Sequence, residues 1–127
     1  MNFIKALIKI EEATMFGICI FFLVSLKVPW WVYILLAIGP DISMLGYFLG
    51  NKTGADCYNF FHHKGVAIIA FATGVVLNSH TGDIVSIAGI ILFGHSSMDR
   101  MLGYGLKLNQ GFKYTHLGMI GKKKIES

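Results

Sequence analysis

The chain has 127 residues, of which 54% are hydrophobic and 14% are charged, and its formal net charge is +4. Its mean hydropathy is +0.61, whereas a soluble domain carries about 25% charged residues. A soluble chain of this length could not bury so much apolar surface, so the composition excludes an ordinary soluble domain. It predicts one integral membrane domain over residues 1–127, with the lipid bilayer as its partner.

Four apolar stretches divide the chain. Only residues 28–49 reach the roughly 20 apolar residues that a membrane-spanning helix needs. The other three stretches are long enough only if their helices continue through flanking polar residues. The sequence therefore predicts an all-α membrane protein, a four-helix transmembrane bundle, with spans at about residues 6–26, 29–49, 58–77 and 84–102.

The connections between these spans are short, as in an up-and-down bundle. Turns are expected at residues 27–29, 50–56 and 78–83. The first span has charges interleaved with its apolar residues and lacks the pattern of a cleavable signal peptide, so we expect it to remain. Residues 103–127 form a basic, glycine-containing tail that is expected to lie along the membrane surface.

The basic residues predict the orientation of the bundle. With four spans, ten of the eleven lysines and arginines fall on one side of the membrane and only Lys27 falls on the other. The positive-inside rule then places both termini in the cytoplasm. This distribution also argues against a nucleic-acid partner, because the positive charge lies where membrane topology requires it. The ten residues are Lys5, Lys9, Lys52, Lys64, Arg100, Lys107, Lys113, Lys122, Lys123 and Lys124.

Ionisable residues of all four predicted spans fall at a similar depth. By the helical rise, they lie about 5 to 12 Å from the cytoplasmic ends of their spans. An ionisable group in a membrane is costly unless it is paired or hydrated, so we expect these side chains to face one another inside the bundle. They are Glu11 and Glu12 on the first span, Asp41 on the second, His62 and His63 on the third, and His95 and Asp99 on the fourth.

This polar layer is a candidate metal site. His95 and Asp99 are four residues apart, so both lie on one helix face and could ligate one ion or form a hydrogen-bonded pair. Asp41 follows Pro40, which is expected to kink or break its helix. His62 and His63 point about 100° apart, so only one of them can face inward, and the sequence does not decide which one. The hypothesis is a divalent metal, with zinc favoured.

Each polar residue also has a simpler interpretation. His95 and Asp99 could hydrogen-bond only to hold helices together, and Asp41 could cap the second half of a broken helix. Glu11 and Glu12 could act as a general base, complete a coordination shell, or simply end the interfacial part of the first helix. Four other residues are assigned no role in a metal site: His80 and His116 are expected to be solvated, and Cys19 and Cys57 are expected to be free thiols.

Three blocks carry a resemblance to a family: GHSSMDRMLGYGLKLNQGFKYTHLG at 94–118, GPDISMLGY at 39–47 and YNFFHHKG at 58–65. Together they closely resemble small bacterial integral membrane proteins grouped as domain-of-unknown-function family 4260. The resemblance covers nearly the whole chain and implies a multi-pass protein of the bacterial inner (cytoplasmic) membrane. It implies no particular activity.

A weaker resemblance is to inner-membrane metal-dependent hydrolases. Those enzymes carry a proline–aspartate motif, then a histidine–basic–glycine motif, then a histidine and an aspartate four residues apart, in the order of Pro40–Asp41, 63–65 (HKG) and His95 with Asp99 here. The resemblance implies metal ligands at Asp41, His63, His95 and Asp99 or close to them. Ser43 and Ile68 stand where that family usually has a second acidic residue and a further histidine, which favours a single metal over two.

The functional hypothesis is a metal-dependent hydrolase that acts on an amphiphilic ester or phosphoester reaching the site from the inner leaflet, with Glu11, Glu12 or a carboxylate that is not a ligand as general base. Three alternatives stay open. A non-catalytic membrane scaffold would use the polar layer only to pair helices, and a small transporter or proton path would act as a homodimer. Histidines facing each other across the bundle could instead ligate haem.

Overall fold

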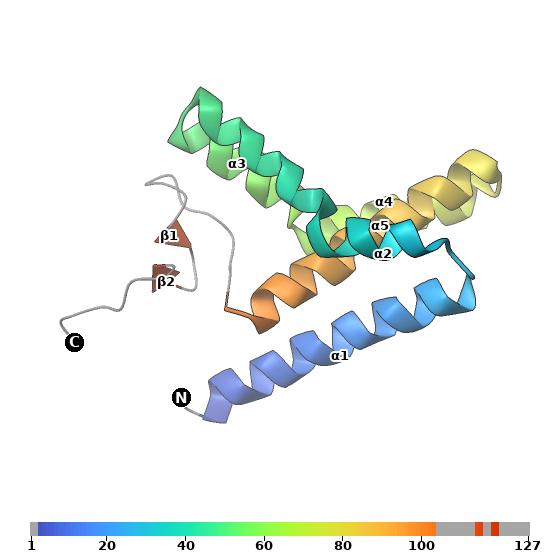
Figure 1. Ribbon diagram of the computed structural model, residues 1–127, viewed down its shortest axis with the longest axis horizontal. Coiled ribbons are helices and arrows are strands. Elements are labelled where there is room, and N and C mark those ends of the chain that lie inside the picture. The colour runs from blue at the N-terminus through green and yellow to red at the C-terminus, as the bar shows by residue number, and fades with distance from the viewer. Residues whose placement is uncertain (1–2, 104–113, 116–117, 120–127) are drawn as a thin grey trace.

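The computed structural model describes residues 3–103, 114–115 and 118–119. Predictions for the rest of the tail, including His116, lie outside the described residues. The fold is all-helical apart from one short antiparallel hairpin, β1 (Tyr114–Thr115) with β2 (Gly118–Met119) (Figure 1). The prediction of an all-α protein is therefore confirmed. The helices are α1 (Phe3–Ser25), α2 (Trp30–Ile38), the 3-10 helix η1 (Gly39–Leu49), α3 (Asn51–Phe61), α4 (Lys64–Leu77) and α5 (His80–Met101).

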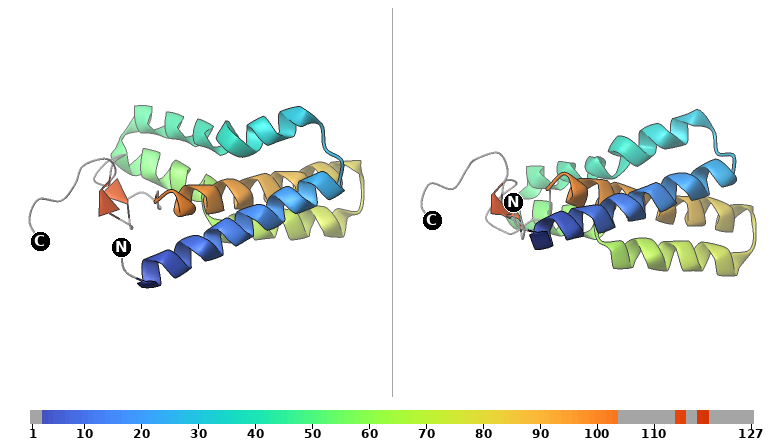
Figure 2. Two further views of the ribbon diagram at one scale, coloured as in Figure 1. Left: turned by 60° about the horizontal axis from the view of Figure 1, so that its bottom comes forward. Right: turned by 90° about the horizontal axis from the view of Figure 1, so that it is seen from below.

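The helices run up and down as four antiparallel legs: α1, then α2 with η1, then α3 with α4, then α5. The start of α1, the turn between η1 and α3 and the end of α5 lie at one end of the molecule, and the α1–α2 and α4–α5 turns lie at the other (Figure 2). Helix α5 contacts α1, α2 and α4, whereas η1 pairs with α3. Helix α5 is therefore the central element of the fold.

The second leg changes its helix type at Pro40. Proline has no backbone N–H to continue an α-helix, and the chain tightens into a 3-10 helix instead of breaking. In a 3-10 helix every third side chain shares a face. One face of η1 is exposed and entirely apolar, with Ile42, Leu45 and Phe48. Asp41 lies on another face, which turns its carboxylate toward α3 and α5.

The third leg differs from the prediction of one helix over residues 58–77. The structure divides it at 62–63 into α3 and α4, which meet at a bend of 46°. Helix α3 also begins at Asn51, so the predicted connection of residues 50–56 shrinks to Gly50, whose φ of +124° favours glycine. The α3–η1 contacts stabilise a helix that its Asn, Thr, Gly and Asp residues disfavour on their own.

Small residues bring α4 and α5 close together. A Cβ atom added to Gly89 would lie 2.6 Å from the backbone nitrogen of Phe71, and one added to Gly74 would lie 2.4 Å from the carbonyl oxygen of Gly82. Close backbone approach through small residues is typical of helix pairs in membranes. This packing fixes the position and rotation of α5 against α4.

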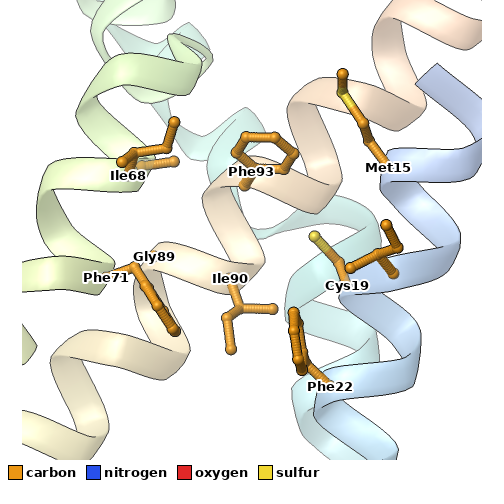
Figure 3. A pocket seen from close by; sticks show the side chains of 10 residues that line it. Met15, Cys19, Phe22, Ile68, Phe71, Gly89, Ile90 and Phe93 are labelled. Atoms are coloured by element: carbon orange, nitrogen blue, oxygen red, sulfur yellow. The ribbon is translucent and has the colours of Figure 1, made fainter. Parts of the chain in front are cut away.

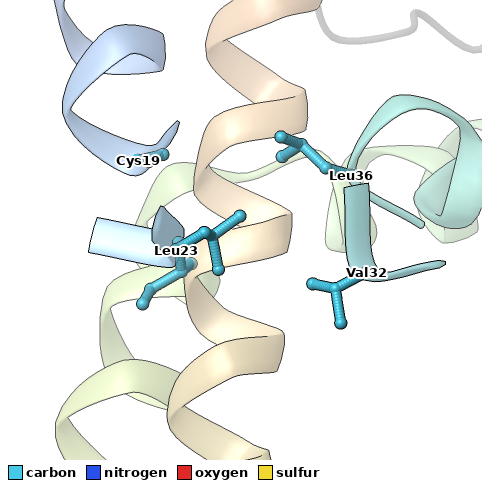
Figure 4. Close-up of a cluster of buried hydrophobic side chains, with 5 residues drawn as sticks. Cys19, Leu23, Val32 and Leu36 are labelled. Carbon is cyan, nitrogen blue, oxygen red and sulfur yellow. The ribbon is translucent and has the colours of Figure 1, made fainter. Parts of the chain in front are cut away.

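The buried apolar core is small. Figure 4 shows Cys19 and Leu23 on α1 and Val32 and Leu36 on α2 around α5, and Ile90 completes this cluster. Most large apolar side chains are instead exposed on the outer faces of the helices. One helical stretch of the described chain, Trp30–Leu49, is long and apolar enough to cross a bilayer, and the bent pair α3–α4 would be a second if it counts as one span. This gives weak support for membrane association.

Candidate metal centre

Three elements bring four ionisable side chains together near the middle of the bundle. Helix α5 contributes His95 and Asp99 from adjacent turns of one face, η1 contributes Asp41 next to Pro40, and the C-terminal end of α3 contributes His62. One possible ligand atom from each of these side chains lies within 4.8 Å of the others. The structure thus assembles one cluster from the predicted second, third and fourth spans.

The atoms of this cluster alternate between nitrogen and oxygen. Asp41 Oδ1 lies 3.0 Å from His95 Nε2 and 3.3 Å from His62 Nε2. Asp99 Oδ2 lies 3.2 Å from His62 Nε2 and 3.5 Å from His95 Nε2. Tetrahedral zinc with ordinary Zn–N and Zn–O bonds would separate neighbouring ligand atoms by about 3.4 Å. The four distances lie around the spacing that one such ion would impose.

Both imidazole rings are oriented by backbone carbonyl groups. His62 Nδ1 lies 2.9 Å from the Tyr58 carbonyl oxygen, and His95 Nδ1 lies 2.9 Å from the Leu36 carbonyl oxygen. A carbonyl oxygen only accepts hydrogen bonds, so each Nδ1 carries the proton and donates it. In a neutral ring, Nε2 then directs a lone pair at the two carboxylates. Metal-bound histidines in known sites likewise donate their other ring N–H to a carbonyl or carboxylate oxygen.

Further contacts hold His62 and Asp99 in place. The Tyr58 hydroxyl donates to Asp99 Oδ2 at 3.0 Å, and the Tyr58 ring stacks on the His62 ring with centroids 3.7 Å apart. The His62 carbonyl oxygen accepts from the Ser96 hydroxyl at 2.7 Å and from Arg100 Nη2 at 3.4 Å. These contacts fix the backbone at the α3–α4 bend, so the imidazole of His62 is preorganised.

Three members of the cluster are buried, and the fourth, Asp41, is partly exposed. His62 and His95 are 2% and 0% exposed. The side chain of Asp99 is 12% exposed and that of Asp41 is 35% exposed. Solvent or a ligand would therefore approach the cluster past Asp41.

His63 is where the structure departs from the predicted ligand set. Its ring is exposed, and its Nδ1 accepts a hydrogen bond from the Gly65 N–H at 3.0 Å, which caps the N-terminus of α4. His62, the neighbour that the sequence could not choose, faces the bundle instead. The structure therefore places His63, which the resemblance implied as a ligand, outside the cluster, because the bend points the two rings in different directions.

Glu11 and Glu12 both lie outside the four-residue cluster. Glu11 is exposed, whereas Glu12 is buried and forms an ion pair with Lys64 at the start of α4. The same ammonium group lies 3.3 Å from Met15 Sδ and 5.4 Å from the centroid of the Phe93 ring. Lys64 therefore engages the carboxylate that was a candidate general base.

Three residues that support the cluster were not predicted from the sequence: Tyr58, Ser96 and Arg100. Tyr58 precedes His62 by one helical turn, and that spacing was a usable signal. Ser96 and Arg100 act on the His62 backbone across 34 and 38 residues of sequence. No pattern in the sequence marks such long-range contacts.

Comparison with family models gives one match, described as "Domain of unknown function (DUF4260)", over residues 5–120. The chain belongs to this family. All four members of the cluster in this DUF4260 chain lie within the matched residues. Neither the comparison with curated proteins nor that with solved structures gives a match, and none of the comparisons supports the weaker resemblance to metal-dependent hydrolases.

Proposed function

We propose that this DUF4260 chain is a multi-pass protein of the bacterial inner membrane whose cluster of Asp41, His62, His95 and Asp99 binds one divalent metal ion. The observation that carries the metal proposal is the convergence of two carboxylate oxygens and two Nε2 atoms whose rings already donate through Nδ1. Four electron-rich atoms at 3.0–3.5 Å repel one another unless a cation lies among them or both rings are protonated.

Charge balance and ligand type favour zinc. A divalent ion neutralises two carboxylates, so neither is left as an uncompensated charge inside the bundle. Imidazole ligands suit zinc and other transition metals, whereas magnesium and calcium prefer oxygen ligands alone. Two imidazole nitrogens and two carboxylate oxygens also complete the four-coordinate shell that zinc commonly adopts.

The membrane part of the proposal is supported by the outer surface. Exposed apolar side chains occur on the outer faces of all four legs, as Phe21, Phe48, Val76 and Ile84 illustrate. A soluble protein rarely exposes continuous apolar patches of such extent. Within the described chain, the basic residues of α1 and α3 lie toward the end that holds the start of α1, whereas Lys27 lies at the opposite turn. This supports a cytoplasmic location for both termini.

Metal content of adjacent histidine variants tests the metal proposal. The protein would be purified in detergent without chelators, and the zinc content of the wild type would be compared with that of His62→Ala and His63→Ala. We expect about one zinc per chain in the wild type and in His63→Ala, and loss of the metal in His62→Ala. Equal zinc content in the two variants would contradict the assignment, and so would a wild type that cannot be loaded with zinc.

The activity that we attach to this centre is hydrolysis of an amphiphilic ester or phosphoester. A bound zinc ion would lower the pKa of a water molecule and supply a nucleophile at neutral pH. For this activity His62, His95 and Asp99 would hold the ion as its three protein ligands. Asp41, the accessible member of the set, would then accept a proton at the entrance instead of ligating the metal. We expect Asp41→Asn to lose lipid-ester hydrolysis by the zinc-loaded protein. Unchanged hydrolysis would exclude this role.

A structural metal centre is the second candidate function, and the ligand count favours it. Four protein ligands fill a tetrahedral shell as in structural zinc sites, whereas catalytic sites keep one position open. The ion would then join η1, α3 and α5 in a non-catalytic scaffold. A scaffold predicts that chelation lowers the melting temperature strongly and that no lipid ester is hydrolysed. A hydrolase predicts turnover that disappears with the metal.

A further inference from the structure

An apolar groove of about 240 Å³ opens between α1, α4 and α5 (Figure 3). It lies on a different face of α5 from His95 and Asp99. Helix α1 contributes Met15 and Phe22, α4 contributes Ile68, and α5 contributes Ile90 and Phe93. No charged or hydroxyl-bearing residue is among its described lining residues. From Met15 to Phe22 the groove extends about 10 Å along α1.

One end of the groove is polar. Glu12 precedes Met15 by three residues, Lys64 precedes Ile68 by four, and Ser97 follows Phe93 by four. Three- and four-residue spacings put each polar residue on the same helix face as a lining residue. The ammonium of Lys64 also contacts the lining residues Met15 and Phe93 directly. All three helices therefore change from polar to apolar along the face that lines the groove.

Ser97 provides a second and independent indication of a ligand. Its side chain is fully buried, and its hydroxyl has no hydrogen-bond partner within the described chain. Buried polar groups in native proteins are almost always satisfied by protein, water or a ligand. Ser97 lies one helical turn beyond Phe93 and outside the lining residues, so a polar group of another molecule in the groove would reach its hydroxyl after a small rearrangement at this end.

We propose that the groove binds one acyl chain of a glycerophospholipid, with the ester region of the lipid against Lys64 and Ser97. Lys64 and Ser97 are both donors, and an ester carbonyl is only an acceptor. Glu12 already balances the charge of Lys64, so a neutral acceptor fits this end better than a second carboxylate would. The apolar lining then takes the hydrocarbon chain.

The size of the groove favours an acyl chain over a helix, and its position separates it from the metal centre. A helix from a second copy of the chain is about 10 Å across, so only its side chains could enter the groove, whereas an acyl chain can lie along it. The groove is also distinct from the metal centre. Phe93 and His95 are two residues apart on α5, which turns their side chains about 200° from each other. The inference rests on the membrane part of the proposed function and is independent of the metal.

Photocrosslinking in bilayers tests this site with a matched pair of variants. The probe is a phosphatidylcholine with a diazirine partway along one acyl chain, in nanodiscs that contain the wild type, Ile68→Trp or Ile69→Trp. Both isoleucines are exposed on α4, but only Ile68 lines the groove. We expect crosslinks at the lining residues of the wild type and of Ile69→Trp, and a loss of about tenfold in Ile68→Trp, whose indole fills the groove.

The polar end has its own controls. An ether-linked phosphatidylcholine lacks the ester carbonyls, so it should crosslink less than the ester lipid, and Ser97→Ala should reduce that difference. Three results would overturn the proposal: crosslinks spread evenly over outer residues such as Phe48, equal labelling of the two isoleucine variants, or chain-to-chain crosslinks at the groove. Failure of the wild type to enter nanodiscs would instead contradict the membrane assignment itself.

Discussion

Two faces of α5 show two ways of placing polar groups in this bundle. On one face, His95 and Asp99 lie one turn apart, and each side chain of the cluster contacts a carbonyl, a hydroxyl or another cluster member. On the other face, Phe93 and Ser97 have the same spacing, but the Ser97 hydroxyl has no partner in the described chain. The first face has the side chains to hold an ion, whereas on the second face we propose a contact with another molecule.

The largest expected effect comes from removing the negative charge of one carboxylate in the cluster of Asp41, His62, His95 and Asp99. Asp99→Asn keeps the shape of the side chain but replaces a proposed carboxylate ligand with an amide. We therefore expect zinc affinity to fall by more than the roughly 10–100-fold loss that is typical when a residue hydrogen-bonded to a ligand is changed. Competition with a chelating indicator would measure it. The control is Asp56→Asn, which alters an exposed carboxylate paired with Lys52 on α3. If both variants bound zinc like the wild type, Asp99 would not be a ligand.

A change in the packing of α5 should disturb both faces together. The Cβ of Gly89→Ala would lie 2.6 Å from the backbone nitrogen of Phe71, so α5 or α4 must shift at a cost of about 1–3 kcal/mol. The control is Gly17→Ala, because nothing lies within 4 Å of a Cβ there. Thermal unfolding in detergent should show a lower melting temperature only for Gly89→Ala. Equal melting temperatures would mean that the close α4–α5 approach does not stabilise the bundle.

A smaller effect is expected from the residue that supports two members of the cluster. Tyr58→Phe removes the hydroxyl that donates to Asp99 and keeps the ring that stacks on His62. Changes of this kind typically lower metal affinity about tenfold. Cobalt substitution adds a spectroscopic test, because a shifted ligand changes the visible spectrum. Tyr33→Phe, on α2 and outside the cluster, serves as control. An unchanged affinity and spectrum in Tyr58→Phe would show that the hydroxyl does not position Asp99.

The smallest effect tests whether the two faces are independent. Ile68→Trp should block the groove and leave zinc affinity within about twofold of the wild type, because well-separated sites without shared partners behave additively. The same chelator competition measures this. A large loss of zinc affinity in Ile68→Trp, but not in Ile69→Trp, would show that the groove and the metal centre are coupled through α5.

The sequence identifies three members of the cluster, but it does not identify the shape of the chain around them. Asp41, His95 and Asp99 are recognisable because ionisable residues inside apolar helices are costly and must pair. Helical periodicity cannot choose between His62 and His63, since the bend that separates them depends on contacts with Ser96 and Arg100 far along the chain.

Two parts of the fold were beyond prediction for related reasons. Residues 51–56 have the composition of a loop, and only their packing against η1 makes them helical. The length of the 3-10 helix after Pro40 is also set by that packing, because proline alone predicts a break or a kink. The Glu12–Lys64 ion pair joins residues 52 positions apart, and charge pattern alone does not identify such partners.

X-ray absorption spectroscopy at the zinc edge of the purified, zinc-loaded protein tests the four-ligand centre most directly. Ligation by Asp41, His62, His95 and Asp99 predicts a first shell of two imidazole nitrogens and two carboxylate oxygens at about 2.0–2.2 Å, without sulfur. A sulfur scatterer at about 2.3 Å would instead indicate Cys19 or Cys57 as a ligand. A shell without imidazole, or a protein that does not retain zinc, would contradict the centre.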